Sequence, residues 1–246
     1  MIQIYKKKYQ TCLQMLDALR VKKPELKDEI LSYAGVLDPL AQGFVPVLVG
    51  REENQNRVHF TNAKKKYTFD VLVGVSTDTF DLLGLVTKFL PNNSGIDYAE
   101  LENMFLGHSR AFDQTVSLFS NKKYKGKSLW EWGREGVLVP EEERPFTPVV
   151  IYDFSINKQY FVTKKKLKSD TELMKSNFDN TFRIDAVVGK WNAYFDKNNI
   201  DEYRVLSFDI FVSKGFYIRK LVEDISKTSG TPMLVYELIR NEVLDC

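Results

Sequence analysis

The sequence predicts an α+β fold with a mixed sheet. Segments in which apolar and polar residues alternate are interspersed with segments of helical spacing, without the strict order of a doubly wound parallel sheet. No internal repeat is present. With 246 residues, of which 43% are apolar, the chain can bury one large core, and we expect a single domain over residues 1–246.

The first predicted element is a helix over residues 11–20. Thr11 is a suitable N-cap because its hydroxyl can accept a hydrogen bond from a free backbone N–H. Leu13, Leu16 and Leu19 follow at helical spacing. We therefore expect a helix that packs these leucines on the core.

Two segments have the period-two pattern of strands. A long strand is predicted over residues 67–75, because apolar side chains occupy every second position. The alternation returns at residues 208–212, and after the turn 213–215 the spacing becomes helical from Ile218 onward. The remaining predicted strands cover residues 44–49, 148–156 and 182–188, and the remaining predicted helices cover residues 97–106, 128–135 and 233–241.

Lysines are grouped along the chain. Residues 157–181 are polar and lysine-rich, and we expect an inserted loop or a solvated helical excursion there. The net charge of +2 does not by itself indicate a polyanionic partner. Each lysine group alone is typical of a solvated face, but several groups beside tyrosines favour a nucleic-acid surface. The other groups lie at residues 6–8, 64–66, 122–127 and 164–168.

Several chemistries lack support in the sequence. Cys12 and Cys246 form neither a disulfide framework nor a C-x-x-C pair, and His59 and His108 have no ligands at metal-binding spacing, so no metal is expected. Phosphate-binding glycine loops and a G-x-S-x-G elbow are missing, so we expect no cofactor. Without a signal peptide or an 18-residue apolar run, the chain is expected to be cytoplasmic and free of membranes.

The stretch GVLDPLAQG constrains one carboxylate strongly. Pro39 disfavours the helical conformation at Asp38 and favours an extended one, while Gly35 and Gly43 allow close backbone approach. An alternative is a helix start with Asp38 as N-cap and proline at the first helical position. The dipeptide alone leaves both interpretations open.

This stretch, extended to GVLDPLAQGFVPVLVG, resembles the signature loop of the TruB-type pseudouridine synthases. Further blocks resemble the family's K-x-Y strand with its T-D-T-x-D segment, its lysine-rich segment, its S-K-G-x-Y-I-R helix start and its leucine-arginine pair. The resemblance covers most of the chain in order. The blocks are KKYTFDVLVGVSTDTFDLLG, QTVSLFSNKKYKGKSLWEWGREG, EERPFTPVVIY, SKGFYIRKLVEDI and LIRNEV.

The resemblance implies a fold and an activity. The fold is the pseudouridine synthase fold, with a mixed, largely antiparallel central sheet flanked by helices and an RNA-binding cleft. The activity is that of a tRNA pseudouridine synthase, which flips the uridine at position 55 of the T loop and isomerises it without a cofactor. The expected partner is RNA, most specifically the T arm of tRNA. A monomer is favoured, and the family's C-terminal PUA domain is expected to be absent.

The resemblance also implies site residues. Asp38 takes the role of the catalytic carboxylate, and Arg219 takes the role of the cation that pairs with this carboxylate. Tyr67 takes the role of the residue that stacks on the flipped base, with a possible general-base role. Because an arginine gains nothing from the dipole at a helix start, Arg219 needs a local partner. For Tyr67 the alternative is a strand tyrosine packed in the core. Asp78 and Asp81 are expected to hold the loop around Tyr67.

The expected substrate-binding residues include aromatic and apolar side chains near the site and lysines for phosphate contacts. Such phosphate contacts position the RNA and make binding salt-sensitive, but they do not read its sequence. The residues are Tyr217, Leu37, Tyr33, Lys64, Lys65, Lys66 and Lys214, with Lys122 and Lys123 as further phosphate contacts.

The chain departs from the family pattern at several positions. Tyr33 stands where a histidine is usual, Val116 replaces a proline and Leu83 replaces an aspartate. The opening segment KKKYQTC lacks the proline and glycine of K-P-x-G-x-T-S. These departures keep two alternatives open, namely a weak or inactive RNA-binding protein or tRNA chaperone on the same scaffold, and a synthase acting on another RNA.

Overall fold

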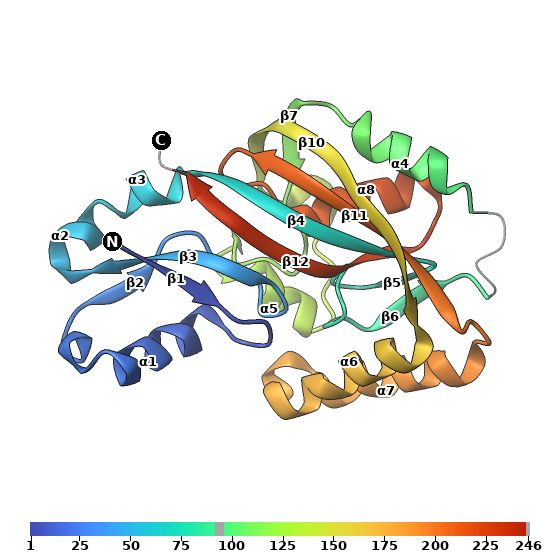
Figure 1. Ribbon diagram of the computed structural model, residues 1–246, viewed down its shortest axis with the longest axis horizontal. Coiled ribbons are helices and arrows are strands. Elements are labelled where there is room, and N and C mark those ends of the chain that lie inside the picture. Colours follow the sequence, from blue (N-terminus) through green and yellow to red (C-terminus); the bar gives the residue numbers. More distant parts are fainter. Residues whose placement is uncertain (92–95, 245–246) are drawn as a thin grey trace.

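A computed structural model describes residues 1–91 and 96–244 and confirms the α+β fold with a mixed sheet (Figure 1). The main sheet has the strand order β1-β3-β12-β4-β11-β10-β7, with β2 paired to β3. Among the strand pairs of the main sheet in these residues, only β12 and β3 run parallel. The expectation of a largely antiparallel sheet is therefore also confirmed.

The elements follow one another with these bounds. The strands are β1 (Ile2–Lys6), β2 (Leu31–Tyr33), β3 (Gln42–Val49), β4 (Lys64–Val73), β5 (Val75–Thr77), β6 (Val86–Phe89), β7 (Ala111–Thr115), β8 (Lys123–Tyr124), β9 (Lys127–Ser128), β10 (Phe146–Thr163), β11 (Glu202–Val212) and β12 (Met233–Leu244). The helices are α1 (Cys12–Lys22), α2 (Gly50–Gln55), α3 (Arg57–Thr61), α4 (Tyr98–Leu106), α5 (Leu129–Arg134), α6 (Lys164–Asn177), α7 (Ile184–Lys197) and α8 (Ile218–Ser229), with 3₁₀ turns at Pro24–Leu26, Glu141–Glu143 and Asn180–Phe182.

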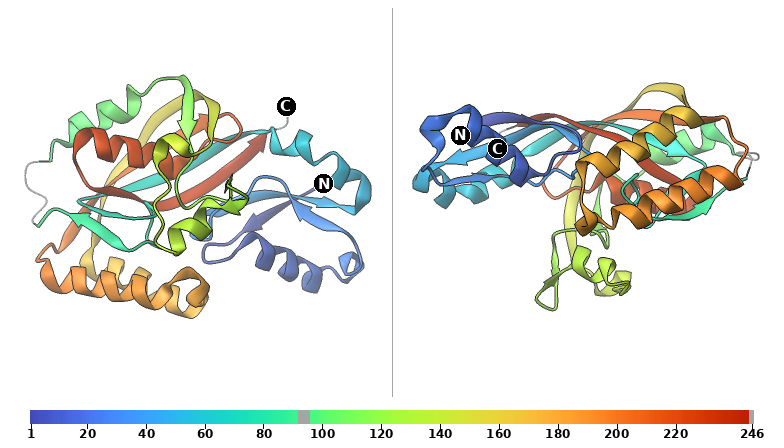
Figure 2. Two further views of the ribbon diagram at one scale, coloured as in Figure 1. Left: turned by 180° about the vertical axis from the view of Figure 1, so that it is seen from behind. Right: turned by 90° about the horizontal axis from the view of Figure 1, so that it is seen from below.

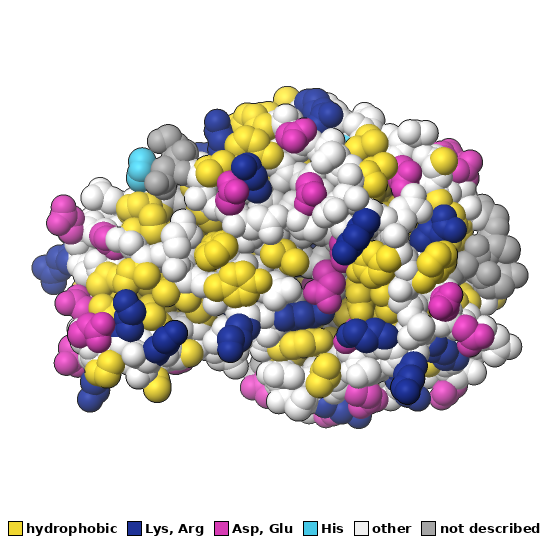
Figure 3. All heavy atoms as spheres, viewed as in Figure 1, with side chains coloured by type: hydrophobic (Ala, Val, Ile, Leu, Met, Phe, Trp, Pro, Cys, Tyr) yellow, Lys and Arg dark blue, Asp and Glu magenta, His cyan; other side chains and the backbone are white. Residues whose placement is uncertain are grey.

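The two faces of the sheet are covered differently. Helices α4 and α8 lie on one face, seen from behind in Figure 2, and the main apolar core fills the space beneath them. The hairpin of α6 and α7 lies along one edge of the opposite side and encloses a second core around Trp191. The segment around α5 projects from the body in the right-hand view of Figure 2. On the face shown in Figure 3, apolar and charged side chains are mixed at the surface.

The parallel pair of β12 and β3 brings the N-terminal strands to the rest of the sheet. Ile239 lies opposite Gln42, and Arg240 lies opposite Gly43. Since β2 and β3 flank residues 34–41, this pairing places the Asp38 turn against the sheet and near the start of α8.

Most elements predicted from periodicity are confirmed. The predicted helix at 11–20 is α1, and its capping box at Thr11 is formed. Its buried face carries Cys12, Met15, Leu16 and Leu19, whereas Leu13 is exposed, so the prediction was wrong for Leu13. The other confirmed elements are the strands at 44–49, 148–156 and 208–212, and the helices at 97–106, 128–135 and from Ile218. The strand predicted over 67–75 is confirmed as far as Val73, whereas Val75 begins β5 in a separate two-stranded sheet.

Two predicted elements were wrong. Residues 233–241 form the strand β12, not a helix, because β12 is buried on both faces and its continuous apolar run hides the period of two. Residues 182–188 were expected to form a strand, but Phe182 ends a 3₁₀ turn, Arg183 precedes α7, and residues 184–188 form the start of that helix. The short apolar run continues at helical spacing to Trp191, Tyr194 and Phe195, all buried.

The lysine-rich segment 157–181 has regular structure. Its first residues continue β10, and most of the remainder forms α6. Leu167, Thr171 and Met174 form the buried face of α6, against α7, while lysines occupy its outer face. Among the helices of residues 1–91 and 96–244, none is long and apolar enough to cross a membrane.

Gly43 allows the close approach of β12. Gly43 has φ +125°, and a Cβ there would lie 2.2 Å from the carbonyl oxygen of Arg240. We expect Gly43→Ala to lower the free energy of unfolding by about 3 kcal/mol, since both the backbone conformation and the space oppose a side chain. Urea denaturation followed by circular dichroism measures this change.

Gly189→Ala is the matched control. A Cβ at Gly189 in α7 would meet no atom within 4 Å. Because alanine favours helix over glycine, this variant should be more stable by about 0.5–1 kcal/mol. Equal denaturation midpoints for the two variants would contradict the packing described at β12.

Candidate active site

Asp38 begins a tight turn. The carbonyl of Asp38 accepts a hydrogen bond from the N–H of Ala41 at 3.0 Å, with Pro39 at the second position of the turn. The helix start considered from the sequence is therefore not present. Leu37 and Leu40 are buried on either side, whereas the side chain of Asp38 is 33% exposed. The turn thus presents a carboxylate to solvent on an anchored backbone.

A buried lysine anchors this turn. The Lys6 ammonium, at the end of β1, donates to the carbonyls of Ala41 at 2.6 Å and Pro39 at 3.3 Å, and to that of Gln10 at 2.5 Å. Lys6 has no solvent exposure. Burial lowers the pKa of Lys6 to about 8, although the charge of Asp38 partly opposes this shift.

Arg240 holds the two flanks of the same loop. Its Nε donates to the carbonyl of Phe44 at 2.7 Å, and its Nη2 donates to that of Gly35 at 3.1 Å. Residues 35–44 are therefore fixed by Arg240 at their ends and by Lys6 at their centre. Charge-assisted hydrogen bonds of this kind are stronger than neutral ones.

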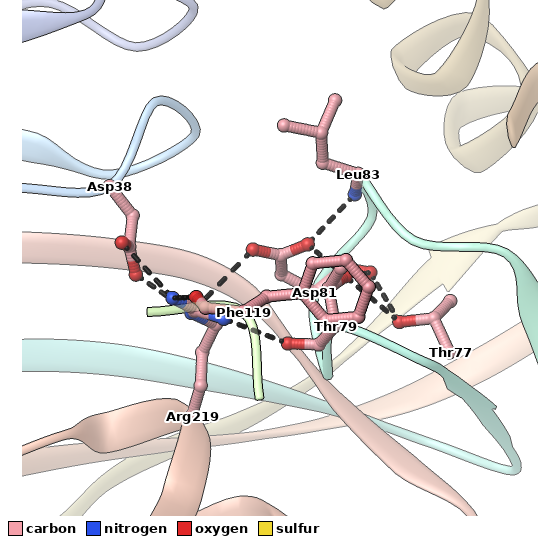
Figure 4. Close-up of polar contacts among 7 residues, drawn as sticks. All are labelled: Asp38, Thr77, Thr79, Asp81, Leu83, Phe119 and Arg219. Atoms are coloured by element: carbon pink, nitrogen blue, oxygen red, sulfur yellow. Dashed lines mark hydrogen bonds and ion pairs between the residues drawn. The ribbon is translucent and has the colours of Figure 1, made fainter. Parts of the chain in front are cut away.

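The carboxylate of Asp38 is paired with a buried arginine (Figure 4). Arg219, in the first turn of α8, donates from Nε to Oδ2 of Asp38 at 2.7 Å and from Nη2 to Oδ1 at 3.1 Å. The side chain of Arg219 is only 7% exposed. The local partner expected for Arg219 is thus Asp38, held in the bidentate geometry that fixes both distance and orientation.

Two further loops surround the guanidinium. Its Nη1 donates to the carbonyl of Thr79 at 3.1 Å, and its Nη2 donates to that of Phe119 at 3.0 Å. Asp81 Oδ2 lies 3.8 Å from its Nε. Burial alone would lower the pKa of Arg219, but the charges of Asp38 and Asp81 more than offset it and raise that pKa.

Asp81 is a second, deeper carboxylate. Its Oδ1 accepts from the Thr79 hydroxyl at 2.6 Å and from the N–H of Leu83 at 2.9 Å. Burial raises the pKa of Asp81 to about 6, and Arg219 opposes that rise. Oδ1 of Asp78 accepts from the N–H of Leu85 at 2.8 Å. Asp78 and Asp81 thus hold the loop 78–85 by hydrogen bonds, while its expected place around Tyr67 stays a prediction.

The three aromatic candidates lie on different elements, and Tyr217 is the one whose electrostatic environment includes Asp38. Tyr67, on β4, is 7% exposed and belongs to the same apolar cluster as Leu37. The backbone of Tyr217 exchanges two hydrogen bonds with the buried side chain of Gln114. Burial, and then the charge of Asp38, raise the pKa of Tyr217 to about 12. Tyr33 is half-buried on β2 against that cluster, with Arg57 5.8 Å from its ring centre.

The lysine candidates do not gather at one place. Lys64 and Lys66 lie on the sheet face opposite Tyr67, over the rings of Tyr152 and Phe211. Lys65 shares the face of Tyr67 but is buried, and its ammonium donates to the carbonyls of Ala63 at 2.6 Å and Thr61 at 3.2 Å. This geometry argues against a phosphate contact by Lys65.

Lys214 lies in the turn before α8. Its ammonium donates to Oδ1 of Asn62 at 2.8 Å. The lysine is exposed, so its side chain can reach solvent from the edge of the site. As for the other lysines, phosphate binding by Lys214 stays a prediction from the sequence.

Sequence reasoning missed two contributors to the site, Lys6 and Arg240, and one function of a third, Asp81. Lys6 and Arg240 lie in segments that were compared with the family pattern, but only their contacts reveal the anchoring of the Asp38 loop. Asp81 was expected to support the loop, and its position beside Arg219 adds a second negative charge. Among residues 1–91 and 96–244, no group of three histidine, cysteine, aspartate or glutamate side chains is placed to hold a metal ion.

The chain is similar to known sequences. A family model described as TruB family pseudouridylate synthase (N terminal domain) matches residues 23–173. The tRNA pseudouridine synthases B of Shewanella denitrificans and Shewanella frigidimarina are 31% and 29% identical to it over 214 and 213 residues. Each alignment covers 87% of this chain and 52% of the relative, so the chain spans about half the length of these relatives.

Solved structures share the fold. The crystal structure of a Cbf5-Nop10-Gar1 complex matches with a TM-score of 0.55 at 14% identity, covering 98% of this chain and 48% of that chain. An H/ACA RNP bound to a substrate RNA containing 2′-deoxyuridine matches with a TM-score of 0.53 at 12% identity, covering 98% of this chain and 46% of that chain. Both likenesses support the α+β architecture described above.

The raised pKa of Asp81 predicts a pH dependence of stability. The folded chain binds a proton at Asp81 more tightly than the unfolded chain, for which the pKa is about 3.9, so this contribution to stability falls as the pH rises from about 4 to 6. The free energy of unfolding of the wild type minus that of Asp81→Asn should therefore fall by up to about 3 kcal/mol between pH 4 and pH 7. Urea denaturation across this range measures it, and a pH-independent difference would contradict the assignment.

Proposed function

The chain belongs to the TruB family of pseudouridylate synthases, and we propose that it is a tRNA pseudouridine synthase that isomerises the uridine at position 55 of the T loop. The reaction breaks the N-glycosidic bond between N1 and the ribose, turns the base over and joins its carbon five to the ribose. The proton on carbon five is then lost and N1 gains a proton, so the isomerisation involves no net change of oxidation state and needs no oxidant or reductant. A carboxylate in a fixed position therefore provides chemistry suited to both halves of the reaction.

One observation carries the proposal. It is the bidentate ion pair between the buried guanidinium of Arg219 and the partly exposed carboxylate of Asp38. The pair holds both carboxylate oxygens of Asp38 against a buried cation in one fixed orientation. Its exposed part leaves room for a ribose to approach. We assign Asp38 to attack the target nucleotide, or to act as the counter-charge of the ribosyl cation formed when the glycosidic bond breaks.

The neighbouring side chains support a place for the base. Tyr67 and Leu37, the residue before Asp38, belong to the main apolar cluster, and the charge of Asp38 acts on Tyr217. An extruded base needs an apolar and aromatic surface to replace the stacking lost from the RNA. We assign Tyr67 to that contact and Tyr217 to the support of the site.

The projecting segment around α5 supports an RNA partner. Its cationic side chains lie over its aromatic rings, with Lys127 4.6 Å from the ring centre of Trp132 and Arg134 5.1 Å from that of Trp130. Lys122 and Lys123 are exposed beside them. Cations and aromatic rings together suit a phosphate backbone and unstacked bases. We propose that the T arm of tRNA lies between this segment and the Asp38 turn.

The experiment is turnover of a tRNA transcript by Asp38→Asn. Because the amide is neither an anion nor a nucleophile, we expect pseudouridine formation to fall by at least about 1000-fold, with RNA binding changed by less than about tenfold. Pseudouridine is counted by mass spectrometry, and binding by filter retention. Asp17→Asn is the control, since Asp17 lies on the exposed face of α1, with 78% of its side chain accessible.

The product also separates the alternative functions. Pseudouridine at position 55 of the wild-type reaction supports the proposal, and its loss from a transcript with cytidine at that position checks the site. Product at another position or only in another RNA would replace the target. Tight RNA binding without product from any transcript would identify an RNA-binding protein or a tRNA chaperone.

A further inference from the structure

Arg183 connects the α6–α7 hairpin to the active-site loops. It precedes α7 and adopts the left-handed conformation, with φ 58° and ψ 30°. Such a conformation is uncommon for a residue with a side chain, so surrounding contacts have to hold it. The side chain is only 19% exposed and leads toward the loops that surround Arg219.

The first contact is an ion pair with Asp78. The Nη1 of Arg183 donates to Oδ2 of Asp78 at 2.8 Å, and the Asp78 side chain is 24% exposed. The other oxygen of Asp78 accepts from the N–H of Leu85, whose carbonyl accepts from the N–H of Asp78 at 3.1 Å. The ion pair therefore fixes the closed ends of the loop 78–85.

The second contact is with the ring of Phe119. The guanidinium of Arg183 lies 4.8 Å from the ring centre, a distance typical of a cation–π contact. On α5, a Cβ at Gly133 would lie 2.8 Å from the same ring, so the ring packs closely on that glycine. Phe119 is therefore held between α5 and Arg183.

These two contacts meet at Arg219. The loop 78–85 provides the carbonyl of Thr79 and the carboxylate of Asp81, and Phe119 provides a third acceptor from its carbonyl. Figure 4 shows these two segments beside Arg219, on the sides not taken by Asp38. The guanidinium of Arg183 contacts both of them, through Asp78 and through the ring of Phe119.

The hairpin supports the same loop at a second point. The indole N–H of Trp191 in α7 donates to the carbonyl of Leu82 at 3.0 Å, and both side chains are fully buried. Leu40, two residues after Asp38, belongs to the same apolar cluster. The apolar cluster of the α6–α7 hairpin therefore includes buried side chains from the Asp38 turn and from the loop 78–85. Arg183 adds a polar contact between the hairpin and the loop 78–85.

We propose that Arg183 is a positioning residue for the reaction. It holds the loop 78–85 and Phe119 in register so that Arg219 presents Asp38 in one orientation. The kinetic part of this inference rests on the proposed function. Because Arg183 acts through other residues, its loss should affect the chemical step more than the binding of RNA.

Kinetics of three variants test the proposal. We expect Arg183→Gln to lower kcat about tenfold with KM changed less than about threefold, since a small misplacement of a reacting group is costly to the rate. Arg183→Lys keeps the ion pair but not the planar face, and should recover about a third of the wild-type kcat. An unchanged kcat, or a higher KM alone, would overturn the proposal, and the latter would make Arg183 an RNA contact.

Arg204→Gln is the matched control. Arg204 also lies over a ring, 4.1 Å from the centre of that of Tyr98, but none of its contacts is with either loop at Arg219. We expect it to keep the wild-type kcat. Thermal melting of each variant checks that it is folded, and Arg183→Lys carries the test if Arg183→Gln does not fold.

A second measurement does not depend on activity. The Nε–H of Arg219, bonded to Asp38, gives an NMR signal that is assigned by its absence from Arg219→Lys. Arg183→Gln should shift this signal and speed its exchange with water, while Arg204→Gln should leave it unchanged. An unperturbed signal in Arg183→Gln would overturn the positioning role, whereas absence of turnover by the wild type would overturn only the proposed function.

Discussion

The bidentate pair between Asp38 and Arg219 is the interaction on which the site depends. A buried guanidinium is tolerated only when its charge and its N–H groups are satisfied, because their desolvation is otherwise not compensated. Here Thr79 and Phe119 supply carbonyls, and Asp81 supplies a second negative charge. Thr79 and Asp81 are buried on these sides of the guanidinium, whereas Asp38 is a partner with a partly exposed side chain.

Two departures from the family pattern are accommodated by the α6–α7 hairpin. Tyr9 occupies the glycine position of the opening motif and still has φ 63°, a left-handed conformation that costs a non-glycine residue roughly 1 kcal/mol. Its ring packs 6.2 Å from that of Phe178, which follows α6. Leu83, in place of the aspartate, is buried in the hairpin's cluster. Both departing side chains therefore pack on residues of the hairpin's cluster.

Anchoring of the Asp38 loop shows how charge is used inside this fold. Lys6 and Arg240 are both fully buried, and the acceptors found for their side chains are backbone carbonyls. Their hydrogen bonds hold a loop that has no regular structure of its own. The Asp38 carboxylate therefore needs no strand or helix beneath it, because cations from β1 and β12 hold the backbone of its loop in place.

The sequence by itself determined the strands of period two and the turn before α8, because periodicity and turn chemistry are local. The choice of Asp38, Tyr67 and Arg219 as site residues came from the resemblance to the TruB family and not from any local pattern. Tertiary structure decided that residues 233–241 form a strand, that Lys64 and Lys66 lie on the face opposite Tyr67, and that Arg183 joins the loops at Arg219. Asp38 and Arg219 are 181 residues apart. The spacing of apolar residues shows which side chains share a face of a helix or strand. It does not show which segment, remote in the sequence, packs on that face.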